Sequence, residues 1–369
     1  TGEGEQFKIE GVVDSESLRA DGVYVKGVNI EGTVAGTNED YEANGKVIAE
    51  MLTYDDLRID LLRATGNVRG TGTDFRWVGE LQAIAVKSGA MTIGNLYLKD
   101  AVAELRDREL RAQAGTGRAK RFEIGDVEFE ELQARALKFS MPNGGIDISA
   151  PNATTARFKT PDYELKNVQG KNIRVKNSKR VTTVDVDGLS SSDAELAGAK
   201  VNGVTANGFR FRDDPSKTDV TISGLKARRV DSDGTIIEGV DAPEIAISNR
   251  NGLTTVYADR SRVARIDTGA ALLGDLNIAG IRLSIRNGTV EGRSDDIDAG
   301  DITITESKQL ATGGKLEGVK IVRPVFIVER SGRYRASADM SIGGGTVGSI
   351  ALGAATANVL INNDVARLT

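Results

Sequence analysis

The sequence lacks the residue types on which most enzymatic and metal chemistry depends. Its 369 residues contain no histidine and no cysteine, one tryptophan and six prolines. Without histidine and cysteine, catalytic triads, thiolate nucleophiles, disulfides and most zinc sites are excluded. The 48 basic and 53 acidic residues nearly balance, so we expect no nucleic-acid partner. We therefore expect a protein that is not an enzyme and that holds neither a cofactor nor a metal.

The composition indicates many strands joined by tight turns. Forty-three glycines accompany frequent Val, Ile and Thr, and no polar linker interrupts the chain. No apolar run approaches the length of a membrane-spanning helix. We expect residues 1–369 to form a single continuous β-repeat array, which is a piece of a longer chain.

Turn signals recur along the chain at intervals of 34 to 44 residues. An interval this regular is typical of a repeat protein. Asn-Gly is the strongest short hairpin signal, because both central residues of a type I′ turn need a positive φ. The turn signals are Gly36-Thr37, Gly70-Thr71, Asp107-Arg108, Asn143-Gly144, Asn177-Ser178, Asp213-Asp214-Pro215, Asn251-Gly252, Asn287-Gly288 and Ser331-Gly332.

Alternating apolar residues flank these turns and predict strands with one buried face. A glycine or proline stands five to eight residues before the turns, and at Gly280 the alternation slips, since Ile278 and Ile281 are three apart. Such slips are typical of bends. We predict an all-β, elongated, repetitive antiparallel meander of about 36-residue hairpin repeats, creased into a U-shaped groove. The alternative is a β-helix or solenoid with Gly/Pro columns as corners. The column is Gly170, Gly208, Pro243, Gly280 and Pro324.

Three segments resemble the AsmA/TamB-like envelope proteins of Gram-negative bacteria: Leu272–Arg293 (LLGDLNIAGIRLSIRNGTVEGR), Leu316–Met340 (LEGVKIVRPVFIVERSGRYRASADM) and Gly348–Leu368 (GSIALGAATANVLINNDVARL). The resemblance lies in the rhythm of the strands. It implies a β-taco groove that carries phospholipid through the periplasm, with inner- and outer-membrane components as partners at the chain ends. It also implies a membrane anchor outside this chain.

A groove for acyl chains needs an apolar lining without charges, because each buried methylene contributes roughly 0.8 kcal/mol. The expected lining residues are Ile173, Val175, Phe209, Phe211, Ile245, Ile247, Ile281, Leu283, Ile285, Val325 and Ile327. At each of these positions the alternative is a side chain packed in an ordinary core.

Two other functions fit the same repeat. A structural or adhesive β-solenoid surface protein would have parallel coils and a closed core. A carbohydrate-active β-helix enzyme would need a carboxylate cluster in a cleft, and the few aromatic residues argue against it. Acidic stretches such as 185–188, 231–234 and 295–298 lack the loop of an EF-hand, so we expect solvated turn carboxylates there.

Overall fold

The computed structural model describes residues 6–20, 22–37, 39–107, 109–141, 145–160, 163–178, 180–196, 199–232, 234–305, 313–363 and 365–368. Contacts divide the chain into two compact units, residues 1–186 and 187–369. All regular structure in the described residues is β-strand. None of them forms a helix that could cross a membrane.

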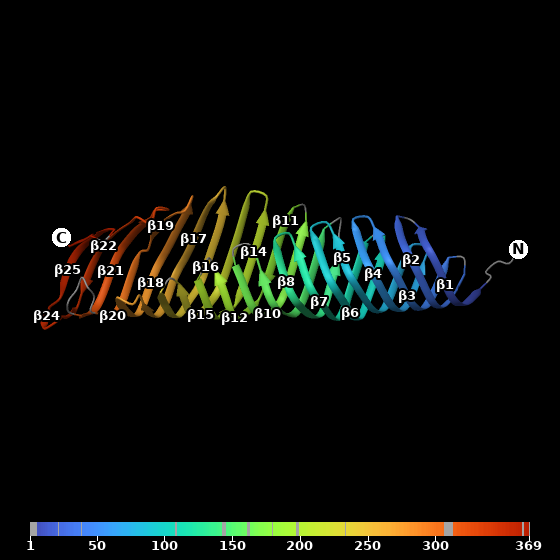
Figure 1. Cartoon of the computed structure of the whole chain (residues 1–369), viewed down its shortest axis with the longest axis horizontal. Helices are drawn as coiled ribbons and strands as arrows, with labels where there is room; N and C mark the ends of the chain where they lie inside the picture. Colours follow the sequence, from blue (N-terminus) through green and yellow to red (C-terminus); the bar gives the residue numbers. More distant parts are fainter. Residues whose placement is uncertain are drawn as a thin grey trace. The chain divides into compact units, whose positions relative to one another are not determined.

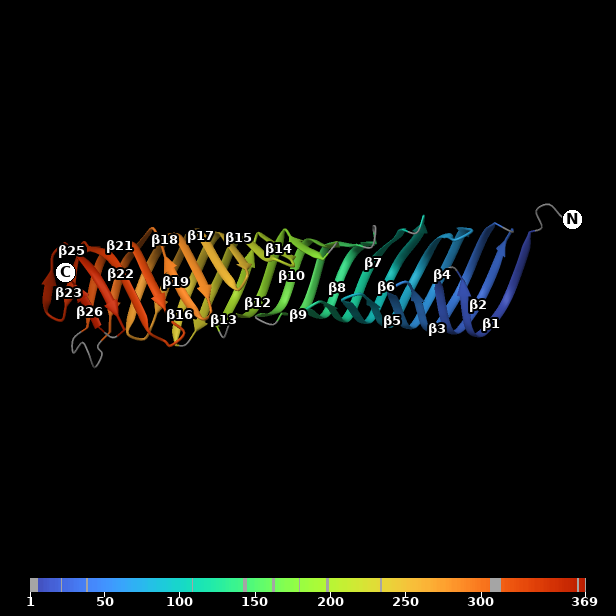
Figure 2. The same cartoon turned by 90° about the horizontal axis from the view of Figure 1, so that it is seen from above.

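The first unit contains eleven described strands. They are β1 (Phe7–Ala20), β2 (Val23–Gly36), β3 (Asp40–Tyr54), β4 (Leu57–Thr71), β5 (Asp74–Ser88), β6 (Met91–Arg106), β7 (Glu109–Ile124), β8 (Val127–Ser140), β9 (Ile146–Lys159), β10 (Tyr163–Ser178) and β11 (Val181–Val186). Each pairs antiparallel with the next along the chain, and Figure 2 shows them side by side in chain order.

The second unit continues the pattern, with several strands divided into two segments. They are β12 (Gly188–Leu196), β13 (Ala199–Ala206), β14 (Gly208–Asp214), β15 (Lys217–Ser232), β16 (Thr235–Arg250), β17 (Leu253–Asp267), β18 (Ala271–Arg286), β19 (Thr289–Arg293), β20 (Asp296–Ile304), β21 (Gly314–Val328), β22 (Tyr334–Ile342), β23 (Gly344–Val347), β24 (Ile350–Leu352), β25 (Ala355–Asn362) and β26 (Val365–Leu368). β13 and β14 both pair with β15, and β19 and β20 both pair with β18.

The antiparallel meander predicted from the sequence is confirmed, including its hairpins and long strands. Asn251 and Gly252 have φ values of 52° and 74°, and Asn287 and Gly288 have 52° and 78°, as type I′ turns require. The parallel pairing of a β-helix is absent, since every register among the described strands is antiparallel. The turn signal at Asn143-Gly144 lies outside the described residues.

Strands bend at residues in the left-handed region of φ. In β18 these corners are Asp275 and Gly280, with φ of 49° and 62°. The β17–β18 ladder omits both residues yet keeps the same register on either side. Each corner shifts the alternation by one, so Leu273 and Leu276 face the same way, as do Ile278 and Ile281. Figure 1 shows the bends aligned along one edge of the ribbon in each unit.

Two corners five residues apart divide such a strand into three parts. In β6 the corners are Asn95 and Asp100, and in β10 they are Asn167 and Asn172. We call the part before the first corner the first wall (91–94 in β6), the part between the corners the base (96–99), and the part after them the second wall (101–106). The same names apply to the other strands of each unit. A residue belongs to the first wall, the base or the second wall if the strand pairing connects it to that part of β6 in the first unit or of β18 in the second. The sheet of each unit is therefore a trough.

The predicted crease column coincides with a corner at Gly280 and at Pro243, which both ladders of β16 omit and which lies opposite Gly224, with a φ of 60°. Gly170 lies in the base of β10, Gly208 follows a break at Asn207, and Pro324 follows a corner at Arg323, which has a φ of 51°. The other column, made of the first corners such as Asn95 and Asp275, was missed. Many corners are Asn, Asp, Leu, Glu or Ala, so glycine and proline alone do not mark them.

The base holds the most buried side chains. In the second unit Val263, Leu276, Ala299 and Val319 form one row across β17, β18, β20 and β21, and each is at most 6% exposed. Residues that follow a corner pair with small neighbours, for example Leu225 with Ala242 and Ile281 with Ala258. This large-to-small alternation lets neighbouring strands interdigitate where the sheet bends.

A candidate apolar trough

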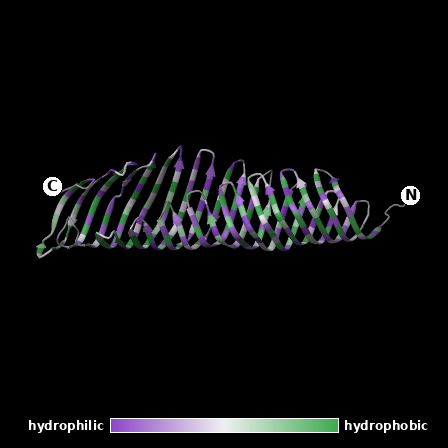
Figure 3. Cartoon of the chain, in the orientation of Figure 1, coloured by the Kyte–Doolittle hydropathy of each residue, from purple (hydrophilic) through white to green (hydrophobic). Residues whose placement is uncertain are grey.

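The register brings most of the predicted lining residues together on the inner face. In the second wall of the second unit, one row across the strands runs Phe211, Val220, Ile247, Val256 and Leu283. The next row runs Phe209, Ile222, Ile245, Ala258 and Ile281, and Ile285 lies nearer the hairpin turns. In the first unit, Val175 pairs with Ile148, and Ile173 with Ala150. Figure 3 shows the resulting bands of hydrophobic and hydrophilic residues along the strands.

Val325 and Ile327 do not share this face, and their prediction was wrong. Leu283 pairs with Gly292, and Gly292 pairs with Phe326, so Phe326 continues the inner row. Val325 pairs instead with Arg293, on the outer face. The corner at Arg323 causes the difference, because the alternation restarts at the residue after it.

Charged side chains are almost absent from the inner face. The only one among the described paired positions of the walls and base is Asp213, which lies near a hairpin turn. Its carboxylate accepts a hydrogen bond of 2.6 Å from the Thr218 hydroxyl. Two further polar pairs lie at the same level, Asn177 with Thr182 at 2.8 Å and Asn249 with Thr254 at 3.2 Å. The trough is therefore apolar inside and polar beside these three turns, one of which carries the carboxylate of Asp213.

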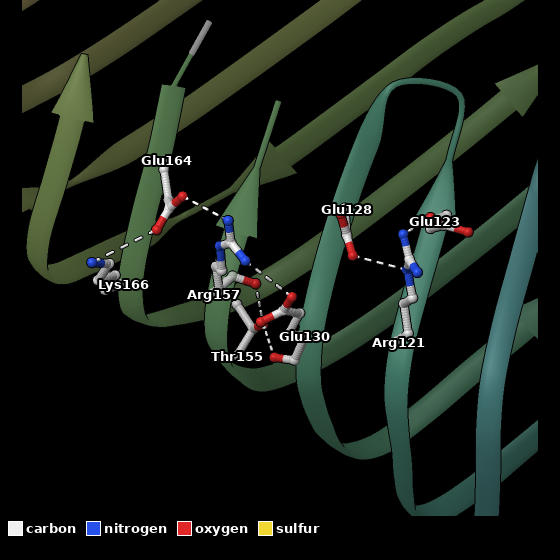
Figure 4. A network of polar contacts seen from close by, with 8 residues as sticks. All are labelled: Arg121, Glu123, Glu128, Glu130, Thr155, Arg157, Glu164 and Lys166. Carbon is white, nitrogen blue, oxygen red and sulfur yellow. Dashed lines mark hydrogen bonds and ion pairs between the residues drawn. The ribbon is translucent and has the colours of Figure 1, made fainter. Parts of the chain in front are cut away.

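The outer face carries ion pairs between strands. Arg157 on β9 lies between Glu130 on β8 and Glu164 on β10, with nitrogen–oxygen distances of 3.1 and 2.9 Å (Figure 4). The hydrogen bond from Arg157 lowers the pKa of the Glu164 carboxyl. Arg121 on β7 pairs with Glu128 on β8 and with Glu123 on its own strand. These pairs connect adjacent strands on the side that faces away from the trough.

Side chains of the walls are less covered than those of the base. Ile173, Val175, Ile245, Ile247 and Leu283 are half-buried, whereas residues beside the corners are buried. In a closed β-sandwich, inward side chains interdigitate with a facing sheet and lose nearly all exposure. Extensive backbone contacts join only strands that are neighbours in the sheet.

Two hollows open at the edge of the second wall in the first unit. The larger has a volume of 1330 Å³ and is lined by the inner-row residues Phe7, Tyr41 and Phe75 together with charged residues such as Lys8 and Arg69. They alternate with Gly36 and Gly70 across β1 to β5. The Tyr41 ring lies over Gly70, and burial raises the pKa of the Tyr41 hydroxyl. The smaller hollow, near Leu110 and Phe139, has a volume of 490 Å³.

The residues predicted to line the trough did not include those of the first wall or of the base. The residues two before and one after a corner face inward, as Ile93 and Leu96 do around Asn95 and Phe129 and Leu132 do around Glu131. An apolar pair three apart around Asn, Asp or Gly is the signal that could have found many of them. A row of small residues at the second corner, Gly11, Gly32, Gly45, Gly66, Gly79, Ala101 and Ala114, was also missed.

In the part of the chain that is described, no three acidic side chains come close enough to hold a metal ion. Asp295, from one of the acidic stretches, pairs with Arg282 at 3.1 Å. Comparison with known proteins finds no protein-family model and no curated protein that matches this chain.

Proposed function

We propose that this protein carries phospholipid by its acyl chains along the trough, in the periplasm of a Gram-negative bacterium. The observation that carries the proposal is the inner face, which is apolar in both units and has Asp213 as its one charged residue among the described positions. A charged side chain inside would have to be desolvated by each passing hydrocarbon chain. A trough free of such barriers suits a cargo that moves along it.

The width of the base fits a thin hydrocarbon cargo. Two corners five residues apart, such as Asn95 and Asp100, separate the walls by roughly 15 Å at about 3.3 Å per residue. Packed β-sheets lie only about 10 Å apart. The walls are therefore too far apart to close fully on each other, and each methylene inserted between them contributes roughly 0.8 kcal/mol.

The open edge suits the other end of a phospholipid. Beside three of its hairpin turns the inner face carries polar pairs: Asn177 and Thr182, Asp213 and Thr218, and Asn249 and Thr254. A headgroup at this edge would stay hydrated while the acyl chains lie below it. The resemblance of 272–293 and 316–340 to AsmA/TamB-like proteins supports the same cargo, with membrane components at the chain ends as partners.

The structural or adhesive alternative loses its architectural basis. That function was argued from parallel coils around a closed core, whereas the strands here are antiparallel and the wall side chains are half-buried. An extended β-surface could still serve adhesion without any cargo. The experiment below separates the two functions.

Trp77 is the single tryptophan of the chain, and it lies on the inner face of β5. Purified protein is mixed with vesicles of phosphatidylcholine whose acyl chains carry bromine, which quenches indole fluorescence on contact. We expect quenching of Trp77. A W77F/V78W variant moves the indole to the neighbouring outer position and should be unquenched. Equal quenching of both proteins, or of neither, would contradict an acyl-chain cargo.

A further inference from the structure

Three hairpins carry the same inward pair near the turn that ends the second wall, and one of them differs by a charge. Asn177, Asp213 and Asn249 lie 36 residues apart, and a threonine follows each of them by five residues. The amides of Asn177 and Asn249 donate to their threonines at 2.8 and 3.2 Å, whereas Asp213 accepts from Thr218 at 2.6 Å. Asparagine therefore supplies the same kind of contact, so the hairpin alone does not account for a charge at position 213.

Among the described residues, no cation forms an ion pair with Asp213. The basic residues of the same hairpin, Arg212 and Lys217, lie at outer positions. Arg212 pairs with Asp214 at 3.9 Å, and Lys217 pairs with Asp219 at 2.9 Å. The Thr218 hydroxyl contacts one carboxylate oxygen of Asp213, Oδ1. The other oxygen, Oδ2, can therefore accept a hydrogen bond from a cation in the trough.

Asp213 begins a polar stretch of one row across the second wall. The row continues through Thr218, Asn249 and Thr254, and it becomes apolar at Ile285. Asp213 and Asn249 lie two strands apart, which is roughly 10 Å at about 4.8 Å per strand. Asn249 uses one N–H for Thr254, which leaves its other N–H and the Thr254 hydroxyl proton to donate. The stretch thus presents an anion at one end and neutral donors at the other.

We infer that Asp213, Thr218, Asn249 and Thr254 bind the headgroup of a phospholipid that carries a primary ammonium, as phosphatidylethanolamine does. The inference rests on the proposed function and names its substrate class. The ammonium donates charge-assisted hydrogen bonds to Asp213. The phosphate, separated from the ammonium by a short spacer, accepts from Asn249 and Thr254. The acyl chains then lie deeper in the trough, on the row of Phe211 and the row below it.

Two other common headgroups fit this stretch less well. The trimethylammonium of phosphatidylcholine has no N–H to donate, so it forms no hydrogen bond with the carboxylate. Phosphatidylglycerol is a net anion, and Asp213 would meet it as a like charge, which is unfavourable. The site therefore distinguishes lipids by their headgroups, while the trough accepts their acyl chains alike.

The test offers the full chain vesicles that contain phosphatidylethanolamine, phosphatidylcholine and phosphatidylglycerol in equal amounts and with the same acyl chains. The protein is separated from the vesicles, and its retained lipids are extracted and quantified by mass spectrometry. We expect the wild type to enrich phosphatidylethanolamine. D213N should lower this enrichment roughly tenfold, because it loses a charge-assisted hydrogen bond, while the total lipid stays unchanged. It inserts the residue that the equivalent hairpins carry, so the hairpin should form.

Two further variants keep the result decisive. D214N removes the same charge from the neighbouring outer position and should keep the enrichment. D213K should shift the retained lipid towards phosphatidylglycerol, which is a gain that a misfolded protein would not show. Lipid retained by the wild type in the proportions of the vesicles, or an enrichment that D213N keeps or that D214N loses equally, would overturn the headgroup site alone. Absence of retained lipid in the wild type would overturn the proposed function.

Discussion

The ring of Phe326 on β21 occupies the space that a side chain at Gly292 on β19 would need. This contact fixes which face of β21 lines the trough, because Gly292 lies in the row that contains Leu283. It also shows how the inner face is filled where a row combines large and small residues. In the row of small residues at the second corner of the first unit, the backbone of the neighbouring strand takes that space instead.

Gly45 is the first test of that row. A Cβ atom at Gly45 would collide with the backbone of Gly32 and with the carbonyl oxygen of Glu31, whereas one at Gly11 on the outermost strand meets nothing within 4 Å. We expect G45A to destabilise the protein by about 1–3 kcal/mol or more, as overpacking does, and G11A to be near neutral. Urea unfolding followed by circular dichroism measures both. Equal stability of the two variants would mean that the strands can move apart at this corner.

Corners made of ordinary residues store strain that can be released. Leu61 has a φ of 50° and is 49% exposed. A left-handed conformation costs a residue such as leucine about 1 kcal/mol, and asparagine tolerates it better. We expect L61N to raise the stability by roughly 0.5–1 kcal/mol, measured by thermal unfolding. The matched change I84N alters an exposed strand residue without positive φ and should destabilise. A loss of stability in L61N would show that strain at this corner is negligible.

Much of the fold could be predicted from the sequence, because the features that specify it are local. Asn251-Gly252 and Asn287-Gly288 encode their hairpins directly, and alternation shows which face of a strand is apolar. The column of first corners escaped prediction because residues such as Leu61 and Glu131 take positive φ only under the constraint of the folded sheet. Local sequence carries little trace of that constraint.

The candidate site was predicted only on the second wall, and wrongly at its last strand. Pro324 was taken as the bend, but Arg323 is the corner, so Phe326 and not Val325 faces inward. The nearly complete burial of wall residues such as Val86 and Phe122 was not predicted either. Alternation shows which face of a strand is apolar but not how closely the surrounding side chains cover each position.

Acid should weaken the ion pairs of the outer face. Hydrogen bonding from Arg157 lowers the pKa of Glu164 below its ordinary value of 4.5. A carboxyl whose pKa is lowered by folding stabilises the protein above pH 4.5 and loses that contribution as the pH falls through its folded pKa. We expect stability to fall below pH 4.5, and less steeply in E164Q, in urea titrations at several pH values. E244Q removes an exposed carboxylate for which no described residue supplies an ion pair, and should keep the wild-type slope. Parallel slopes in all three proteins would mean that the pair with Arg157 is too well solvated to matter.

A single charge inside the trough should abolish binding of lipid while a charge one residue away should not. Leu283 faces inward on β18, and Ser284 is its neighbour on the outer face. In L283D, an acyl chain at this level must desolvate a carboxylate or leave the site, and either cost exceeds the roughly 0.8 kcal/mol contributed by each methylene. We expect L283D to lose phospholipid that co-purifies with the wild type from a bacterial envelope, measured by native mass spectrometry and lipid extraction. S284D carries the same charge and should retain it. If both variants retain phospholipid, the acyl chains do not lie along this row, and a cargo held elsewhere would be required.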